Sequence, residues 1–273
     1  MRRRLSRPLH FEGVGLHSGL ASALILEPAP WGAGYQVAFG DELYPLASAA
    51  RQGDGRGTTL TFGPHQLMTV EHCLSALRGL GVDDVVLRPE GLEVPLLDGS
   101  ALPFASALTG VLEEGEGESD WLCPTLPLAC SSADGDKTLF ALPWDGFKIT
   151  YVIHYPGSAL GTQMATLDVT PENYAAQVGL CRTFCLKREV EAMQRLGLAK
   201  GGSLDNAVVW DEEGPMNEGG LRCSDEAVRH KILDLIGDLA LTGRRVRGHF
   251  VALRAGHALH LQMVDALMRS ATA

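Results

Sequence analysis

Two stretches of this sequence follow the same order of patterns, and this repetition constrains the fold more than any other feature. Residues 71–87 (EHCLSALRGLGVDDVVL) and 229–253 (RHKILDLIGDLALTGRRVRGHFVAL) each begin near a histidine, continue through a Leu-rich helical pattern to a glycine, and enter a strand pattern. We therefore expect two similar halves, with His72 and His230 near the starts of comparable helices. If the halves pack about a pseudo-two-fold axis, the two histidines meet at their interface, where small-molecule sites commonly form.

A Gly-rich and acidic segment at 110–121 (GVLEEGEGESDW) separates the two halves. Strand and helix patterns occur on both sides of it. A chain of 273 residues that is 45% hydrophobic can form one large domain or two of moderate size. We predict a boundary in this segment, with domains at 1–115 and 116–273.

The second Leu-rich stretch predicts a helix over about 225–242 with two different faces. His230, Asp234 and Asp238 recur every four residues on one side, opposite an apolar stripe. A histidine and a carboxylate one helical turn apart can bind a divalent cation if a third ligand comes from elsewhere. The alternative is a His/Asp pair on a solvent-exposed helix face, which is a common surface feature.

His72 supplies the missing ligand in this hypothesis, and Glu71 directly precedes it. Two histidines, one aspartate and an open position are typical of a catalytic zinc site, and a carboxylate beside a ligand can act as a base. Alternatively, Glu71 is an ordinary acid at a helix N-terminus.

His257 lies on a glycine turn in LRAGHALH, where a loop histidine after a strand could reach the same cleft. A capping or surface role is the alternative for this residue. We expect the remaining candidates to be ordinary structural or surface histidines: His10, His65, His154, His249 and His260.

Charge and composition exclude several classes of protein. The formal net charge of -10 argues against a nucleic-acid partner, because binding phosphate backbones requires a basic surface. The six cysteines include no CxxC pair, so we expect reduced thiols in a cytoplasmic protein. No apolar segment reaches the roughly 18 residues of a membrane span, and no apolar signal-peptide region follows the basic N-terminus.

Several long motifs make the sequence resemble the zinc-dependent UDP-3-O-acyl-N-acetylglucosamine deacetylases of lipid A synthesis. They occur in the family's order over nearly the whole chain: GVGLHSG, TVEHCLSALRGLGVDD, VPLLDGSALPF, CRTFCLKREVEAMQRLGLAKGGSLDNAVV, NEGGLRCSDEAVRHKILDLIGDLAL and GHAL. The resemblance implies an α+β fold of two βααβ-type domains. Each would be a helix layer on a β-sheet, and the two would pack face to face about a pseudo-two-fold axis.

The resemblance also implies an activity and a set of partners. The expected reaction removes the N-acetyl group of UDP-3-O-acyl-GlcNAc, an early committed step of lipid A biosynthesis, with Zn²⁺ as cofactor and Fe²⁺ as the alternative metal. We expect a cytoplasmic monomer that comes at most transiently close to the inner membrane.

The catalytic roles follow from the matching motifs. The resemblance implies that the zinc ligands are His72, His230 and Asp234. It implies that Glu71 is the general base for the attacking water. The remaining catalytic roles would belong to His257 as the proton donor to the leaving amine, Asp238 as its orienting partner, and Thr183 as a donor to the oxyanion.

Substrate-binding roles are implied in the same way. Lys231 would meet the diphosphate, Phe184 would pack on the sugar nucleotide, and His17 would lie near the site in a binding role. Residues 186–203 resemble the family's insert that forms an acyl-chain passage, and its candidate lining residues are Val190, Met193, Leu196 and Leu198. The alternative for this insert is a plain amphipathic helix that packs on its own sheet.

The chain departs from the family pattern at three positions. Cys185 replaces a usual Gly, Asp84 replaces a common Asn, and His260 replaces a frequent Asn.

Two other functions stay open at this point. A zinc amidase for another acylated sugar would share the metal residues but differ at 186–203 and Lys231. A nucleotide-sugar binding module would not need Glu71 and His257 beside three metal ligands, so their joint presence favours an enzyme.

Overall fold

Two five-stranded sheets form the outer layers of the protein. The structure is a computed structural model that describes residues 1–53, 56–115 and 117–271. The first sheet has the order β2 (Leu9–Val14), β3 (Ala21–Pro28), β9 (Val85–Glu90), β4 (Tyr35–Phe39) and β5 (Glu42–Pro45). The second has the order β12 (Leu128–Ser131), β13 (Thr138–Leu142), β19 (Gly248–Leu253), β14 (Phe147–Tyr155) and β15 (Gly161–Asp168).

The two sheets have the same topology. In each, the last strand along the chain inserts at the centre, antiparallel to the second strand and parallel to the third. Helix α1 (Glu71–Gly79) precedes the central strand β9, and helix α5 (Glu226–Leu239) precedes the central strand β19. The internal repeat predicted from the two Leu-rich stretches is therefore confirmed.

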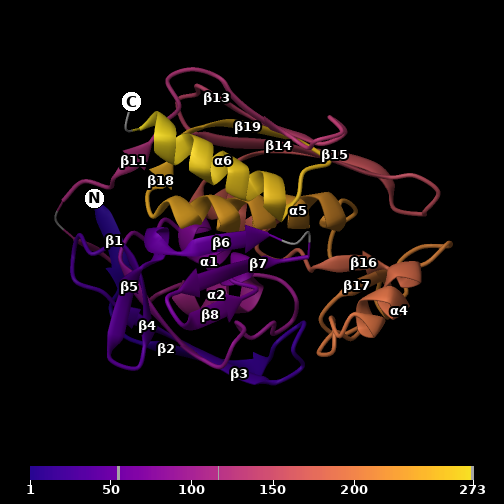
Figure 1. The fold of residues 1–273 in the computed structure, drawn as a ribbon, viewed down its shortest axis with the longest axis horizontal. Helices are drawn as coiled ribbons and strands as arrows, with labels where there is room; N and C mark the ends of the chain where they lie inside the picture. The colour runs from indigo at the N-terminus through magenta and orange to yellow at the C-terminus, as the bar shows by residue number, and fades with distance from the viewer. Residues whose placement is uncertain (54–55, 116, 272–273) are drawn as a thin grey trace.

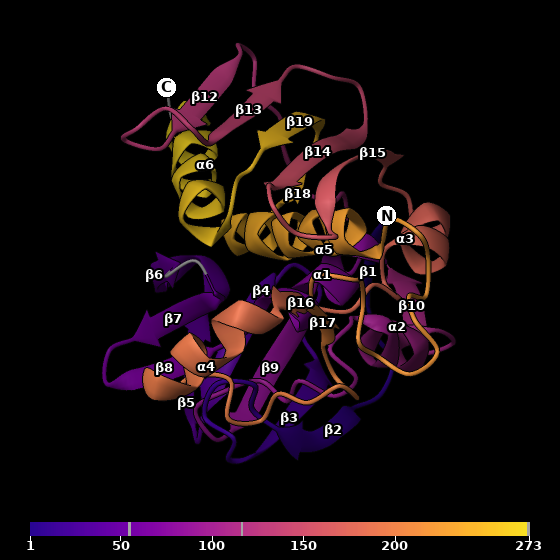
Figure 2. The same cartoon turned by 90° about the vertical axis from the view of Figure 1, so that its right-hand side faces the viewer.

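The main helices lie between the two sheets, as Figures 1 and 2 both show. Helix α1 packs against α5, α2 (Leu102–Leu108) packs against α1, and α6 (His257–Ser270) packs against α5. Each half is thus a helix layer on a sheet, and the helix layers face each other. This confirms the predicted α+β architecture.

In the described residues, every named sheet takes its strands from one side of residue 116 only. One buried hydrophobic cluster nevertheless includes residues from both halves, so the division at 115/116 stays a prediction.

Shorter elements complete the structure. The remaining elements are β1 (Arg2–Leu5), η1 (Leu46–Ser48), β6 (Ala50–Gly53), β7 (Thr58–Phe62), β8 (His65–Met68), β10 (Leu112–Gly115), β11 (Trp121–Leu122), α3 (Pro171–Gln177), β16 (Phe184–Leu186), α4 (Lys187–Arg195), β17 (Val208–Trp210), η2 (Ala240–Thr242) and β18 (Arg245–Val246).

Helix α5 is buried on both of its faces. Ile232 on the apolar stripe has an exposed fraction of 0%, and Asp234 on the opposite side has one of only 2%. The alternative of a solvent-exposed His/Asp pair is therefore wrong, because α5 lies between α1 and its own sheet.

A glycine allows this close packing. A Cβ atom added at Gly237 would lie 2.0 Å from the carbonyl oxygen of Glu71. Any side chain at position 237 would thus push the start of α1 away from α5. The glycine expected to end this helical segment, Gly243, follows η2 and has a φ of 70°.

None of the helices in the described part of the chain is both long and apolar enough to cross a membrane.

Candidate active site

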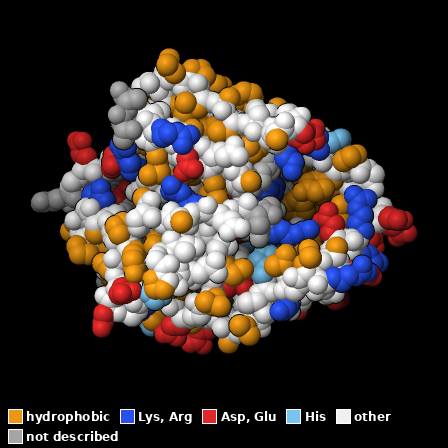
Figure 3. All heavy atoms as spheres, viewed as in Figure 1, with side chains coloured by type: hydrophobic (Ala, Val, Ile, Leu, Met, Phe, Trp, Pro, Cys, Tyr) orange, Lys and Arg blue, Asp and Glu red, His pale blue; other side chains and the backbone are white. Residues whose placement is uncertain are grey.

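A cavity of about 730 Å³ lies between the two halves and receives side chains from both. The start of α1 contributes Glu71 and His72, and α5 contributes His230, Lys231 and Asp234. Figure 3 shows apolar side chains mixed with Lys and Arg on the side of the molecule that carries α4. The cavity therefore combines buried ionisable groups with an apolar portion.

His72, His230 and Asp234 form the first candidate metal-binding group. Their ligand atoms all lie within 4.8 Å of one another. Asp234 Oδ1 is 3.3 Å from His230 Nε2 and 3.7 Å from His72 Nε2. The crossing of α1 and α5 brings these three side chains together, although 158 to 162 residues of sequence separate His72 from the other two.

The hydrogen bonds of this group fit a cation. Asp234 Oδ1 is buried and has no hydrogen-bond partner among the described residues. His230 Nδ1 lies 3.0 Å from the carbonyl oxygen of Cys181, so Nδ1 carries the proton and the Nε2 lone pair faces Asp234. Burial and, to a smaller extent, the charge of His230 lower the pKa of His72 to about 3. Burial also lowers the pKa of His230, so both imidazoles are neutral, as a metal ligand must be.

Glu71 lies beside this group at the start of α1. Its carboxylate accepts a hydrogen bond from the backbone N–H of Thr58 (3.1 Å). Burial raises the pKa of Glu71 to about 7, against the opposing charge of His257. A carboxylate with this pKa can take up and release a proton near neutral pH.

His257 and Asp238 form a buried ion pair next to Asp234. His257 Nδ1 is 2.7 Å from Asp238 Oδ2, and His257 Nε2 is 3.7 Å from Asp234 Oδ2. Burial alone lowers the pKa of His257, but the charge and hydrogen bond of Asp238 outweigh it and raise this pKa to about 9. Burial raises the pKa of Asp238, whereas His257 lowers it to about 2. The pair therefore consists of an imidazolium and a carboxylate at neutral pH.

Two details of this pair differ from the sequence prediction. His257 is the first residue of α6 and not a loop residue. His260, expected in an ordinary structural role, is fully buried and lies 2.7 Å from Asp238 Oδ2 through Nδ1. The signal for His260 was its spacing, because residues three apart at a helix start share one face.

Thr58 is a further residue of the site, and the sequence did not indicate it. Its hydroxyl donates to Asp238 Oδ1 (2.6 Å) while its backbone N–H holds Glu71. A threonine in an ordinary strand pattern gives no sequence signal for this role, which depends on the start of β7 lying beside Glu71, Asp238 and His257.

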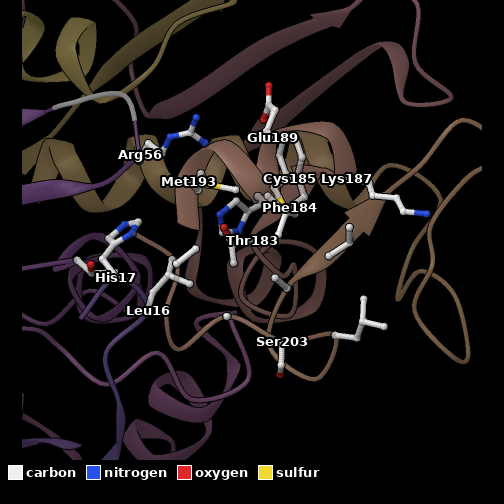
Figure 4. Close-up of a pocket in the computed structure, with 18 of the residues that line it drawn as sticks. Leu16, His17, Arg56, Thr183, Phe184, Cys185, Lys187, Glu189, Met193 and Ser203 are labelled. Carbon is white, nitrogen blue, oxygen red and sulfur yellow. The ribbon is translucent and has the colours of Figure 1, made fainter. Parts of the chain in front are cut away.

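The expected substrate-binding residues all line the cavity. Lys231 Nζ lies 2.6 Å from Asp234 Oδ2, and this ion pair is almost buried. The ring of Phe184 packs edge-on against His230 at 6.2 Å. Thr183 is held by backbone hydrogen bonds to Gly99 and Val208. Figure 4 shows Thr183 and Phe184 near the centre of the cavity, with His17 to one side.

The insert at 186–203 forms much of one cavity wall. Val190 and Met193 line the cavity, as expected. Leu196 and Leu198 are not among its lining residues, and Leu196 is 74% exposed. These two assignments were wrong because α4 ends at Arg195, before either leucine, so the helical pattern does not extend to them.

The three departures from the family pattern lie in different places. Cys185 lines the cavity, and His260 contacts Asp238. Asp84 is fully buried and forms a bidentate ion pair with Arg2 at 2.6 and 2.8 Å. It therefore fastens the N-terminal strand and does not line the cavity.

Comparisons with known proteins identify the family of the chain. The family model for UDP-3-O-acyl N-acetylglycosamine deacetylase matches residues 2–269. A UDP-3-O-acyl-N-acetylglucosamine deacetylase from Myxococcus xanthus (strain DK1622) is 40% identical over 271 residues, which cover 97% of this chain and 86% of that protein. A protein of the same name from Pseudomonas entomophila (strain L48) is 39% identical over 274 residues, which cover 97% and 89%.

A third such deacetylase, from Acidithiobacillus ferrooxidans (strain ATCC 53993 / BNL-5-31), is 40% identical over 273 residues, which cover 97% of this chain and 89% of that protein. The family-model match over residues 2–269 includes both halves and every residue of the cavity described above. The chain belongs to the UDP-3-O-acyl N-acetylglycosamine deacetylase family.

Proposed function

We propose that this protein hydrolyses the N-acetyl group of UDP-3-O-acyl-GlcNAc, giving acetate and a free amine in an early committed step of lipid A biosynthesis. The observation that carries the proposal is one buried site in which the group His72, His230 and Asp234 lies beside a carboxylate and an imidazolium, Glu71 and His257. Family membership supplies the substrate class.

His72, His230 and Asp234 would hold one divalent cation, Zn²⁺ or alternatively Fe²⁺. Two imidazoles and one carboxylate with an open position suit zinc in a catalytic site. Such an ion, when bound, polarises a carbonyl group and makes water a better nucleophile near neutral pH. The Asp234–Lys231 ion pair fixes the second oxygen of the ligand carboxylate.

Glu71 is the general base in this proposal. Its ionised carboxylate accepts the proton of the attacking water, and the Thr58 N–H keeps the carboxylate oriented. The hydroxyl of Thr183, at the cavity surface, donates to the oxygen of the tetrahedral intermediate. A donor of this kind contributes roughly 2.7 to 4 kcal/mol to the transition state.

His257 is the general acid. Asp238 keeps it protonated, and Thr58 and His260 hold Asp238 in turn. The departing nitrogen would otherwise leave as an amide anion, so proton donation from His257 completes the C–N cleavage.

The remaining cavity residues bind the substrate in this proposal. Phe184 packs on the sugar nucleotide, His17 binds at the cavity edge, and the wall formed by Val190 and Met193 receives the acyl chain. Lys231 meets the diphosphate. Because Lys231 Nζ already contacts Asp234 Oδ2, the phosphate oxygens must compete with that carboxylate for the ammonium group. This competition favours a strongly anionic ligand at that position.

We further propose that the two domains are residues 1–115 and 116–273, with the insert at 186–203 in the second. The protein would act in the cytoplasm as a monomer, and its acylated substrate would bring it transiently close to the inner membrane.

A direct assay tests the function. Purified protein is incubated with UDP-3-O-acyl-GlcNAc labelled in the acetyl group, and released acetate is measured with and without a chelator. We expect acetate release that the chelator abolishes and added Zn²⁺ restores. Metal-loaded protein that releases no acetate from this substrate would refute the proposal.

A further inference from the structure

Two cysteine sulfurs lie in contact beside the metal-binding group. Cys181 Sγ and Cys223 Sγ are 3.9 Å apart, although 42 residues separate them in sequence. Cys181 lies between α3 and β16 and is buried, whereas Cys223 lies just before α5 and is partly exposed. A small oxidant from solvent can therefore reach the Cys223 thiol, and the Cys181 thiol lies buried next to it.

Polar contacts hold both segments in register. Arg182 donates to Glu226 through its backbone N–H (2.9 Å) and through Nε and Nη2 (2.9 and 3.1 Å). Arg222 Nη1 donates to the carbonyl oxygen of Leu180 (2.8 Å). These contacts flank the two cysteines on both sides, so the sulfurs stay near each other. A disulfide has an S–S length of about 2.0 Å, so the sulfurs need to approach by roughly 2 Å.

The two thiols differ in their access to solvent. Cys181 is buried, whereas Cys223 is partly exposed. Cys223 is therefore the thiol that a dissolved oxidant reaches first.

Cys181 is directly connected to the metal-binding group. Its carbonyl oxygen lies 3.0 Å from His230 Nδ1 and fixes the orientation of that ring. Partners of this kind tune a metal ligand, and their loss typically costs roughly 10–100-fold in metal affinity or activity.

We propose that Cys181 and Cys223 are a reversible disulfide site that couples peroxide-class oxidants to divalent-metal binding at His72, His230 and Asp234. The Cys223 thiolate attacks one peroxide oxygen, the O–O bond breaks, and a sulfenic acid and hydroxide form. The Cys181 thiol then attacks the Cys223 sulfur, an S–S bond replaces the S–O bond, and water leaves. The two thiols lose two electrons, which reduce hydrogen peroxide to two waters, and a dithiol reverses the bond by exchange.

The expected consequence is weaker metal binding. Drawing the two sulfurs together shifts Cys181, and the hydrogen bond from its carbonyl to His230 lengthens. We expect the affinity for Zn²⁺ to fall by roughly 10–100-fold.

The test uses the full-length protein, with and without treatment by hydrogen peroxide. Peptide mapping without reductant identifies the linked cysteines, and competition with a chromogenic chelator measures Zn²⁺ affinity. We expect a Cys181–Cys223 link, a loss of Zn²⁺ affinity in the range above, and recovery of both after dithiothreitol. Cys223→Ser should bind Zn²⁺ normally and be insensitive to peroxide, whereas the control Cys123→Ser, at an exposed thiol, should behave like the unmodified protein.

Three results would overturn the proposal: no Cys181–Cys223 link, a link with unchanged Zn²⁺ affinity, or an equal loss of affinity in peroxide-treated Cys223→Ser. The coupling rests on the proposed metal ligands but not on the deacetylation reaction. Both readouts are made without substrate, so their failure is distinguishable from a failure of the proposed function.

Discussion

Helix α5 carries two buried groups of similar composition that differ in what they can bind. His72, His230 and Asp234 form one group, and Asp238, His257 and His260 form the other, one turn further along the helix. By residue type and spacing, either group could hold a metal ion. Their hydrogen bonds distinguish them.

In the first group the ligand atoms face one another without shared protons. Asp234 Oδ1 has no partner among the described residues, and the imidazoles of His72 and His230 are kept neutral by burial. Such a group attracts a cation.

In the second group the carboxylate oxygens already have donors. Thr58 donates to Asp238 Oδ1, and both histidines approach Oδ2 through Nδ1. His260 Nε2 lies 3.0 Å from the hydroxyl of Tyr151. This group holds a proton on His257 instead of a metal, so the hydrogen-bond network, not the residue types, separates the two functions.

The most severe test removes one carboxylate charge from each group. We expect Asp234→Asn to lower Zn²⁺ affinity by more than the roughly 100-fold of an outer-shell change and to abolish activity, because a ligand itself is lost. The matched variant Asp238→Asn should keep stoichiometric metal. Metal analysis after gel filtration decides this, and full zinc retention in Asp234→Asn would place the metal elsewhere.

The next largest effect should come from the proton-transfer residues. Glu71→Gln and His257→Gln should each lower kcat by roughly 10²- to 10⁴-fold, since each removes a general base or acid. Both variants should bind zinc stoichiometrically. If Glu71→Gln turns over at the original rate with full zinc, another group is the base.

The pH profile should show the two groups separately. Glu71 must be ionised, so kcat/KM rises with pH through the pKa of Glu71. This pKa is about 7 without a metal ion, and a bound cation would lower it, so the acidic limb should lie at or below about 7. His257 must be protonated, so kcat/KM falls as pH rises through about 9. Asp238→Asn removes the charge that raises the His257 pKa, so its basic limb should move to lower pH. An unmoved basic limb would assign that limb to a different residue.

Gly237 offers a way to disturb the first group alone. Gly237→Ala should lower the free energy of unfolding by roughly 1–3 kcal/mol, because the added methyl overlaps the Glu71 carbonyl oxygen. The start of α1 would move, which should weaken zinc binding and leave the His257 pKa unchanged. Thermal unfolding, a zinc titration and NMR titration of His257 test these three expectations. A larger change in the His257 pKa than in zinc affinity would contradict this separation of the groups.

The smallest effect should come from His260→Asn. We expect kcat to change by less than about tenfold, below the contribution of a direct acid or base. Asp238 would then be shared with a single imidazole, so the His257 pKa and the basic limb should shift upward. A downward shift, measured in the same pH profile as Asp238→Asn, would show that His260 supports the charge of Asp238 instead of competing for it.

The sequence determined the local features of this protein. The period of the Leu-rich stretches predicted α1 and α5, and their recurrence predicted two similar halves, because the hydrophobic period reflects local helix geometry. The four-residue spacing put His230, Asp234 and Asp238 on one side of α5 for the same reason. The long motifs indicated the family.

Only the tertiary structure decided which of these groups meet and what state each is in. The approach of α1 to α5 at Gly237 brings His72 to Asp234, and α6 brings His257 and His260 to Asp238. The neutral imidazole of His72 and the charged one of His257 have the same ordinary pKa. Burial and the nearest charges separate the two values, and these depend on contacts between segments far apart in the chain.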